Sequence, residues 1–153
     1  MKILFVTPVI PTKTDGKRPY NFIKYLSHEH EVHLICLKLA IQTDEDIQEL
    51  EKWGVKTTVF PIQKLRSVMN CARNLTDWNP LRVAWCHYPQ FGEALSKKRK
   101  KEKFDIVHFD RMRMGQYAHQ IQQPKLIDLT DSLMLYLSRS IRFRRTWHER
   151  LVD

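Results

Sequence analysis

The stretch KILFVTPVIPTKTDGKRPYN, residues 2–21, decides the fold class of this chain. It begins with the apolar run KILFVT, passes through a loop that contains Pro8, Pro11 and Gly16, and enters a helix-like pattern near Pro19. A buried strand that leads through a loop into a helix is the opening unit of an open α/β sheet. The loop is a nucleotide-binding turn, an acceptor-binding loop or a plain connection, and residues further along the chain narrow this choice.

Four further apolar runs repeat this unit along the chain. They are VHLICL (32–37), VKTTVF (55–60), FDIVHF (104–109) and KLIDLT (125–130). Most are near-continuous rather than alternating, which is typical of strands that are buried on both faces of a parallel sheet. Helical patterns separate them. The sequence therefore predicts an α/β fold: a three-layer, Rossmann-like open sheet, mostly parallel, with about five to seven strands and right-handed crossovers.

The segment TDEDIQELEKWG, residues 43–54, carries the start and stop signals of a helix. Thr43 is expected as the N-cap, acidic residues fill the first turn, and Gly54 stands where a C-cap is expected. The least regular part is TDWNPLRVAWCHYP, residues 76–89. Its tryptophans and prolines predict an ordered excursion from the α/β pattern.

A third helical pattern is both apolar and basic. Lys64, Arg66 and Arg73 flank its apolar stripe, and Trp78 follows it. Two arrangements fit this pattern: the stripe packs into the core with the charges in water, or the helix lies on an anionic membrane surface. The stripe consists of Leu65, Val68, Met69, Ala72 and Leu75.

The composition is that of one globular domain with an unusual charge. The chain has 153 residues, 42% of them hydrophobic, and a formal net charge of +9. This charge favours anionic partners such as nucleic acid, phosphorylated metabolites or an acidic membrane surface. The sequence shows neither a signal-peptide pattern nor an apolar run of about 18 residues that could span a membrane. We expect a cytoplasmic protein, with peripheral contact to the inner face of the cell membrane as an open alternative.

The cysteines and histidines do not form a metal-binding pattern. Cys36, Cys71 and Cys86 are far apart and are expected to be buried free thiols. No histidine pair stands at metal-ligand spacing with a cysteine partner. The sequence therefore predicts neither a metal nor a cofactor.

In an open parallel sheet, ligands bind beyond the carboxyl ends of the strands, near the point where the strand order reverses. Polar and ionisable residues follow the first, fourth and fifth predicted strands at these ends. We therefore expect one site at this edge of the sheet. Its candidate residues are Asp15, Gly16, Lys17, Arg18, His108, Asp110, Arg111, Asp131 and Ser132.

Each candidate also has a purely structural interpretation. The first loop has neither G-x-G-x-x-G nor a P-loop, so Gly16 is either a plain turn glycine or the start of a helix that presents N–H groups to an anion. His108 is either a hydrogen-bonded core histidine or a reactive group. Asp131 and Ser132 could act only as a helix N-cap. Asp128 lies within a strand, so a basic partner is expected for it.

Three segments in this order resemble the start of glycosyltransferase family 4 proteins. They are MKILFVTPVIPTKTDGKRPYNFIKYLSHEHEVHLICL (1–37), FDIVHFDRMRMGQYA (104–118) and KLIDLTDS (125–132). The match is closest to sugar transferases of bacterial polysaccharide and exopolysaccharide synthesis. The resemblance implies that residues 1–131 are the Rossmann-like acceptor-side half of a GT-B fold. Residues 132–153 would be a basic helical tail leading toward a C-terminal donor-binding domain that is absent from this chain.

The resemblance also implies an activity and a set of roles. The activity is retaining transfer of a sugar from a nucleoside diphosphate sugar to a hydroxyl acceptor, either a sugar or a lipid-linked molecule, without a metal. Gly16 and Arg18 would contact the donor diphosphate and the acceptor, and His108 would lie near the transferred sugar. Asp131 and Ser132 would face the same cleft. The family often has several glycines in the first loop, whereas here Lys17 follows Gly16 directly. This half is expected to be inactive alone.

Two other functions remain open at this point. A non-catalytic basic α/β module would bind nucleic acid or an anionic membrane surface through one continuous positive face. The sequence has no nucleic-acid fold signature, which makes nucleic acid the less favoured partner. A flavodoxin-like nucleotide binder is a weaker option, because the phosphate loop is missing. The positive face would contain Lys97, Lys98, Arg99, Lys100, Arg142, Arg144 and Arg145.

Overall fold

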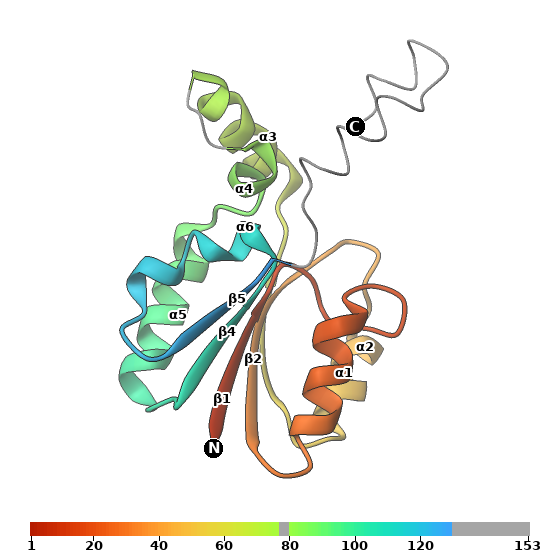
Figure 1. The fold of residues 1–153 in the computed structure, drawn as a ribbon. Coiled ribbons are helices and arrows are strands. Elements are labelled where there is room, and N and C mark those ends of the chain that lie inside the picture. Colours follow the sequence, from red (N-terminus) through yellow and green to blue (C-terminus); the bar gives the residue numbers. More distant parts are fainter. Residues whose placement is uncertain (77–79, 130–153) are drawn as a thin grey trace, which may run out of the picture.

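A computed structural model describes residues 1–76 and 80–129. Within these residues, five parallel strands form one open sheet in the order β3-β2-β1-β4-β5. This confirms the predicted α/β class and the open parallel sheet (Figure 1). The strands are β1 (Lys2–Thr7), β2 (Glu31–Lys38), β3 (Lys56–Pro61), β4 (Ile106–Asp110) and β5 (Lys125–Asp128).

Helices cover both faces of the sheet and make it the middle of three layers (Figure 1). One face carries α1 (Lys17–Leu26) and α2 (Asp44–Glu51). The other carries α5 (Pro89–Lys101), α6 (Met112–Gly115) and the short helix η2 (Ala118–Gln120). The excursion predicted for residues 76–89 contains one short helix among its described residues, and this helix is part of a helical projection beyond the carboxyl edge of the sheet. The projection consists of α3 (Lys64–Arg73), η1 (Asn74–Thr76) and α4 (Leu81–Trp85).

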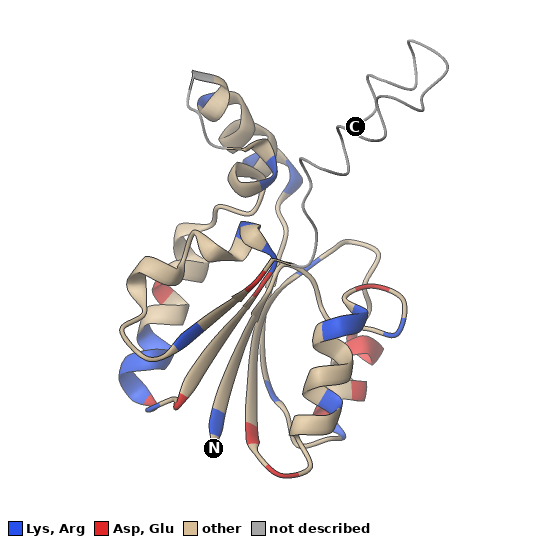
Figure 2. Cartoon of the chain, in the orientation of Figure 1, with Lys and Arg blue, Asp and Glu red and all other residues tan. Residues whose placement is uncertain are grey.

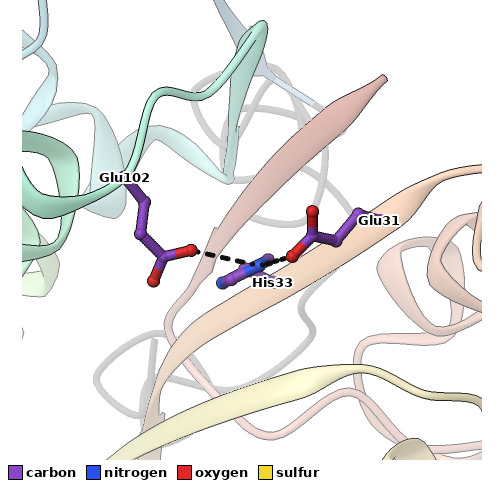
Figure 3. A group of neighbouring side chains, drawn as sticks. All are labelled: Glu31, His33 and Glu102. Carbon is purple, nitrogen blue, oxygen red and sulfur yellow. Dashed lines mark hydrogen bonds and ion pairs between the residues drawn. The ribbon is translucent and has the colours of Figure 1, made fainter.

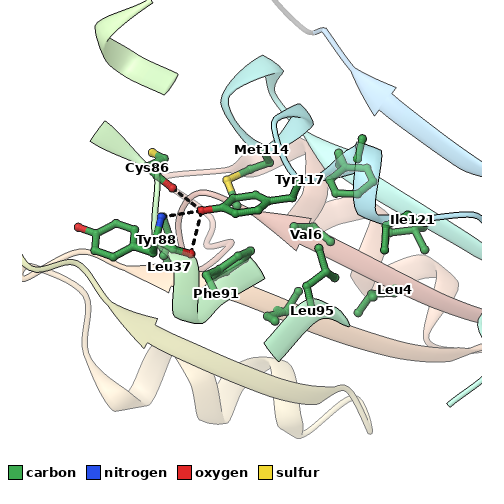
Figure 4. Close-up of a cluster of buried hydrophobic side chains, with 14 of the residues drawn as sticks. Leu4, Val6, Leu37, Cys86, Tyr88, Phe91, Leu95, Met114, Tyr117 and Ile121 are labelled. Atoms are coloured by element: carbon green, nitrogen blue, oxygen red, sulfur yellow. Dashed lines mark hydrogen bonds between the residues drawn. The ribbon is translucent and has the colours of Figure 1, made fainter. Parts of the chain in front are cut away.

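The core is divided into two parts by the sheet, because successive side chains of a strand point to opposite faces. Ile3 and Phe5 of β1 join the cluster under α1 and α2. Leu4 and Val6 join the cluster under α5 and α6 (Figure 4). Both faces of β1 are therefore buried, which explains its near-continuous apolar sequence.

A buried tyrosine fixes the connection between α4 and α5 to the rest of the core. The Tyr117 hydroxyl accepts a hydrogen bond from the Tyr88 amide at 2.8 Å and donates one to the Cys86 carbonyl at 2.8 Å (Figure 4). Burial strongly raises the pKa of Tyr117, so its hydroxyl keeps the proton that it donates. Cys36 and Cys86 are buried free thiols as predicted, while Cys71 is only partly buried.

The start of α2 is as predicted and its end is not. Thr43 is the N-cap, and its amide donates to Asp46 Oδ2 at 2.9 Å. The prediction of Gly54 as the C-cap was wrong, because α2 ends at Glu51 and Lys52 is its cap. Gly54 instead lies in the turn that follows, with φ 76°, and its amide donates to the Glu51 carbonyl at 2.9 Å. Glycine is used there because the turn needs a left-handed backbone.

The apolar stripe of α3 is not in the core. All five of its residues are exposed, so the core arrangement considered for this helix is wrong for these side chains. Within residues 1–76 and 80–129, no helix is both long and apolar enough to cross a membrane. The predicted tail, residues 132–153, lies outside the described residues, as does Trp78.

Candidate functional site

The strand order places a topological switch point between β1 and β4. From β1 the chain runs outward to β2 and β3, and it then crosses back to β4 and β5 on the other side of β1. In open α/β sheets, the carboxyl ends of two such strands flank the ligand crevice. Phe5 of β1 pairs in register with His108 of β4, so this histidine lies at the switch point.

The loop after β1 is a folded segment rather than a loose connection. The Thr7 hydroxyl donates to the Val9 carbonyl at 2.6 Å. The buried Gln42 side chain then pairs with Ile10 like a neighbouring strand: its Oε1 accepts from the Ile10 amide at 3.1 Å and its Nε2 donates to the Ile10 carbonyl at 2.7 Å. No sequence pattern points to Gln42, because a single glutamine in a loop has no recognisable spacing.

Gly16 closes this loop and begins α1. Its φ is 66°, and a Cβ at this position would lie 3.3 Å from the Pro11 Cα, so both the backbone angle and the close approach favour glycine. The first turn of α1 contains Lys17 and Arg18 and no acidic residue, and no side chain caps Gly16 within the described residues. The helix start therefore combines N–H groups with positive charge, as an anion site requires. The side chain of Lys17 is exposed.

Arg18 connects the first loop to the last strand. Its Nη2 lies 3.2 Å from Asp128 Oδ2, and the two side chains are 54% and 10% exposed. This confirms that the nearly buried Asp128 has a basic partner. The guanidinium of Arg18 also lies over the Phe22 ring, 6.0 Å from its centroid.

His108 is 9% exposed and lies between two aromatic rings. Its ring centroid is 4.8 Å from that of Phe5 and 6.1 Å from that of Phe22. Burial lowers the pKa of His108, an effect that the negative charge of Asp128 only partly opposes. The imidazole is therefore neutral at neutral pH. Its Nδ1 has no hydrogen-bond partner within the part of the chain that the structure describes, so the interpretation as a hydrogen-bonded core histidine finds no support at that atom.

Asp110 is a buried carboxyl group at the end of β4. It is 1% exposed, and burial raises its pKa to about 6. Arg111 Nε lies 3.6 Å from Asp110 Oδ2, which is an ion pair but too long for a hydrogen bond. This carboxyl group therefore titrates near pH 6. Strongly shifted pKa values of this kind are concentrated at functional sites.

Arg111 holds the rim together in a strained conformation. Its φ of 64° is unusual for a residue with a side chain. Its amide donates to the Asp128 carbonyl at 3.0 Å, and its Nη2 lies 3.5 Å from Asp15 Oδ1. Strain of this kind persists only where the surrounding contacts impose it, and it occurs often at ligand sites. No sequence pattern predicts the positive φ of Arg111.

The structure thus brings together three acidic groups, two arginines and one neutral imidazole at the β1–β4 switch point. The arginines and the start of α1 can bind an anionic group, and the carboxyl groups and His108 can bind hydroxyl groups. Asp131 and Ser132 lie outside the described residues. The convergent residues are Asp15, Gly16, Arg18, His108, Asp110, Arg111 and Asp128.

A second cluster lies at the opposite, amino-terminal edge of the sheet. His33 Nε2 is 2.9 Å from Glu31 Oε1 and 3.5 Å from Glu102 Oε2 (Figure 3). These atoms are close enough to hold a metal ion. However, the ammonium groups of Lys2 and Lys56 already form ion pairs with the two glutamates. The cluster is therefore interpreted as a charge network that joins β1, β2, β3 and the end of α5.

A hollow of about 390 Å³ opens on the α5–α6 side of the molecule. Within it, His87 Nδ1 lies 2.9 Å from Gln116 Oε1. None of the residues predicted for the site lines this hollow. Its lining consists of His87, Pro89, Gly92, Glu93, Ser96, Gln116, Tyr117, His119 and Gln120.

No family model matches the chain, and a search of curated proteins finds no significant match.

Proposed function

We propose that this chain is the acceptor-side half of a retaining glycosyltransferase, which moves a sugar from a nucleoside diphosphate sugar to a hydroxyl acceptor in polysaccharide or glycolipid synthesis. The observation that carries the proposal is the convergence at the β1–β4 switch point of the Gly16 loop, His108 and the Asp110–Arg111 pair. The same segments carry the resemblance to glycosyltransferase family 4.

The chemistry of glycosyl transfer matches these groups. The bond between the anomeric carbon and the diphosphate oxygen breaks, and the acceptor hydroxyl oxygen bonds to that carbon and gives up its proton. Negative charge develops on the leaving diphosphate, which Arg18, Arg111 and the start of α1 would stabilise. The hydroxyl proton leaves with the diphosphate, so no other reactant is needed.

His108 would position the transferred sugar. A neutral imidazole can accept a hydrogen bond from a sugar hydroxyl with one nitrogen and donate one with the other. Because burial lowers its pKa, it would not add a positive charge beside the anomeric carbon, where positive charge develops during transfer. Asp110 would bind a hydroxyl of the acceptor from the same strand end.

The donor nucleotide requires a second domain in this proposal. Residues 1–129 offer no glycine-rich phosphate loop, so we infer that the nucleotide is held by a donor-binding domain that faces the switch point. The isolated chain would then bind a sugar nucleotide weakly and would not turn it over.

The alternative, a basic module for nucleic acid, has less support. In the described part of the chain, basic residues lie on α1 and β5 as well as on the end of α5 and on the α3–α4 projection, so they are spread over different sides of the sheet (Figure 2). Lys98 and Arg99 are moreover partly buried. Burial lowers the pKa of Lys98, and its ammonium lies 3.9 Å from Glu102. The continuous positive face that this function needs is therefore not formed by the described residues.

A binding titration tests the proposal on the chain itself. Nucleoside diphosphate sugars are added to ¹⁵N-labelled protein, and the amide shifts of Gly16, Arg18 and Arg111 are followed by NMR. We expect saturable shifts at these residues, and we expect Arg18→Ala to weaken binding by at least fivefold. The control Lys24→Ala removes a charge from the far end of α1 and should have no effect. Absence of shifts with every donor tested, or shifts confined to the α5–α6 hollow, would argue against the proposal.

A further inference from the structure

Helix α3 turns its polar side toward the protein. The Ser67 hydroxyl is buried and donates to the Trp85 carbonyl at 2.9 Å. One turn further, the Asn70 Nδ2 donates to the His87 carbonyl at 2.7 Å. These bonds fix which face of α3 meets the protein, so its opposite face must point outward.

The outward side of this helix is apolar. Leu65 is 77% exposed, and Val68 and Met69 share its face because helical residues three and four positions apart are neighbours. A helix that lies in water on the surface of a protein has the reverse arrangement, with its apolar side inward. Leu75 on η1 and Leu81 on α4 are exposed as well, and we call the five exposed apolar residues of the projection the outer face: Leu65, Val68, Met69, Leu75 and Leu81.

Positive charge surrounds the outer face. At 100° per residue, Lys64 lies along one edge of the α3 stripe and Arg73 along the other, and Arg82 is exposed on α4. Figure 2 shows basic residues and no acidic ones on the α3 and α4 ribbons. Between Glu51 and Glu93 the sequence has Asp77 as its single acidic residue. Apolar side chains bordered by basic ones are complementary to an anionic interface.

We propose that the outer face docks on an anionic lipid bilayer. The leucines, Val68 and Met69 would enter the boundary between headgroups and acyl chains, and Lys64, Arg73 and Arg82 would contact lipid phosphates. The projection extends beyond the body of the domain, so the surface can reach a membrane while the sheet stays in water (Figure 1). This proposal does not depend on the glycosyltransferase proposal.

Charge disfavours the other occupants. The C-terminal segment 132–153 is itself basic, and so is a second copy of the chain, so either would bring like charge to the same surface. The charged residues of that segment are Arg139, Arg142, Arg144, Arg145 and Arg150 against Glu149 and Asp153.

Vesicle flotation tests the proposal with the whole chain. Vesicles of phosphatidylcholine with about one third phosphatidylglycerol should bind the protein at least tenfold more tightly than vesicles of phosphatidylcholine alone, and added salt should weaken this binding. Leu65→Ser/Met69→Ser should reduce binding at least tenfold. The control Ile41→Ser, at a residue that is 85% exposed, should leave binding unchanged.

Two double variants that remove the same charge distinguish contact at the outer face from general electrostatic attraction to the membrane. Lys64→Gln/Arg73→Gln should weaken binding at least fivefold, whereas Lys97→Gln/Lys100→Gln on α5 removes the same charge and should change it less than twofold. Circular dichroism checks that each variant is folded, which is expected because all these side chains are exposed. Failure of the wild-type chain to bind, or equal loss in test and control variants, would overturn the proposal. So would a concentration-dependent dimer that Leu65→Ser/Met69→Ser abolishes, because a second copy would then be the occupant.

Discussion

Arg18 and Asp128 form an ion pair of 3.2 Å between the first turn of α1 and the last residue of β5. The pair connects the two sides of the switch point, because α1 follows β1 and β5 follows β4 in the sheet. It places a guanidinium beside the helix start and a nearly buried carboxylate beneath it. The pair thus has both a structural and a binding role in our account.

Arg18→Ala should destabilise the fold through Asp128. The Asp128 carboxylate is only 10% exposed, so water cannot fully solvate it once the guanidinium of Arg18 is removed. The expected loss in free energy of unfolding is about 1 kcal/mol. Lys13→Ala is the control, because the Lys13–Glu49 pair is more exposed and its loss should cost less than about 0.5 kcal/mol. Urea denaturation of the variants measures both values, and equal costs would contradict the structural role.

Asp110→Asn should stabilise the protein at neutral pH. Burial raises the pKa of this carboxyl group from 3.8 to about 6, so the folded state holds the proton more tightly than the unfolded chain. Its contribution to stability is complete below the unfolded pKa and is lost as the pH rises through the folded pKa. Asparagine carries no charge, so the free energy of unfolding at pH 7.5 should rise by roughly 1 to 3 kcal/mol.

The gain from Asp110→Asn should disappear near pH 4, where aspartic acid is neutral in the folded protein. Urea denaturation of both proteins at several pH values measures this difference in the free energy of unfolding. A variant that is less stable than wild type at pH 7.5 would mean that the Arg111 pair outweighs the cost of burial. A gain at neutral pH would mean that Asp110 is kept at a cost to stability, as functional residues often are.

Arg111→Gly should be more stable than Arg111→Ala. Both variants lose the contacts with Asp110 and Asp15, but only glycine adopts φ 64° without strain. The difference should be about 1 kcal/mol in favour of glycine. At Arg113, inside α6, the same two substitutions should show the opposite order, because alanine is favoured within a helix. Thermal unfolding of the four variants decides this, and the same order at both positions would contradict the strain at Arg111.

His33 should make the protein sensitive to mild acid. Burial lowers its pKa below 6.5, so the unfolded chain binds the proton more readily than the folded one. Stability should therefore fall as the pH drops below about 6.5. Glu31 and Glu102 favour the protonated form while Lys2 and Lys98 oppose it, and burial is the largest effect.

Urea denaturation between pH 7.5 and pH 5 should show a smaller loss of stability for His33→Gln than for wild type. Glutamine keeps a donor for Glu31 and does not titrate in this range. His108 also has a lowered pKa, so part of the loss should remain in the variant. An unchanged pH profile would place the acid sensitivity elsewhere.

The sequence predicted the strands well because their signal is local. Near-continuous apolar runs such as ILFV mark strands that are buried on both faces, and the rule about carboxyl ends then located His108 and Asp110 at one edge. A basic partner was predicted for Asp128, because a buried carboxylate needs one. The spacing along the chain could not identify this partner as Arg18. The end of α2 was misplaced because a glycine can serve the turn after a helix as well as its cap.

Other features of the site depend on tertiary contacts. The apolar stripe of α3 has the same periodicity whether it packs into the protein core or lies on a membrane. The sequence therefore left both arrangements open. The positive φ of Arg111 arises from the hydrogen bond of its amide to Asp128 and its pairs with two carboxylates, which have no pattern along the chain. The role of Gln42 likewise depends on a loop that lies far from it in sequence.

A sugar-transfer assay on the chain together with the donor-binding domain that we propose is the decisive test of the proposed function, with His108→Ala beside wild type and with His119→Ala, an exposed histidine, as the control. We expect transfer from a nucleoside diphosphate sugar with retained configuration. We further expect a loss in kcat of about a hundredfold for His108→Ala, because the transferred sugar would be misplaced, with little change in KM for the acceptor and wild-type activity for His119→Ala. Absence of transfer from every donor tested, or full activity of folded His108→Ala, would contradict the proposed function.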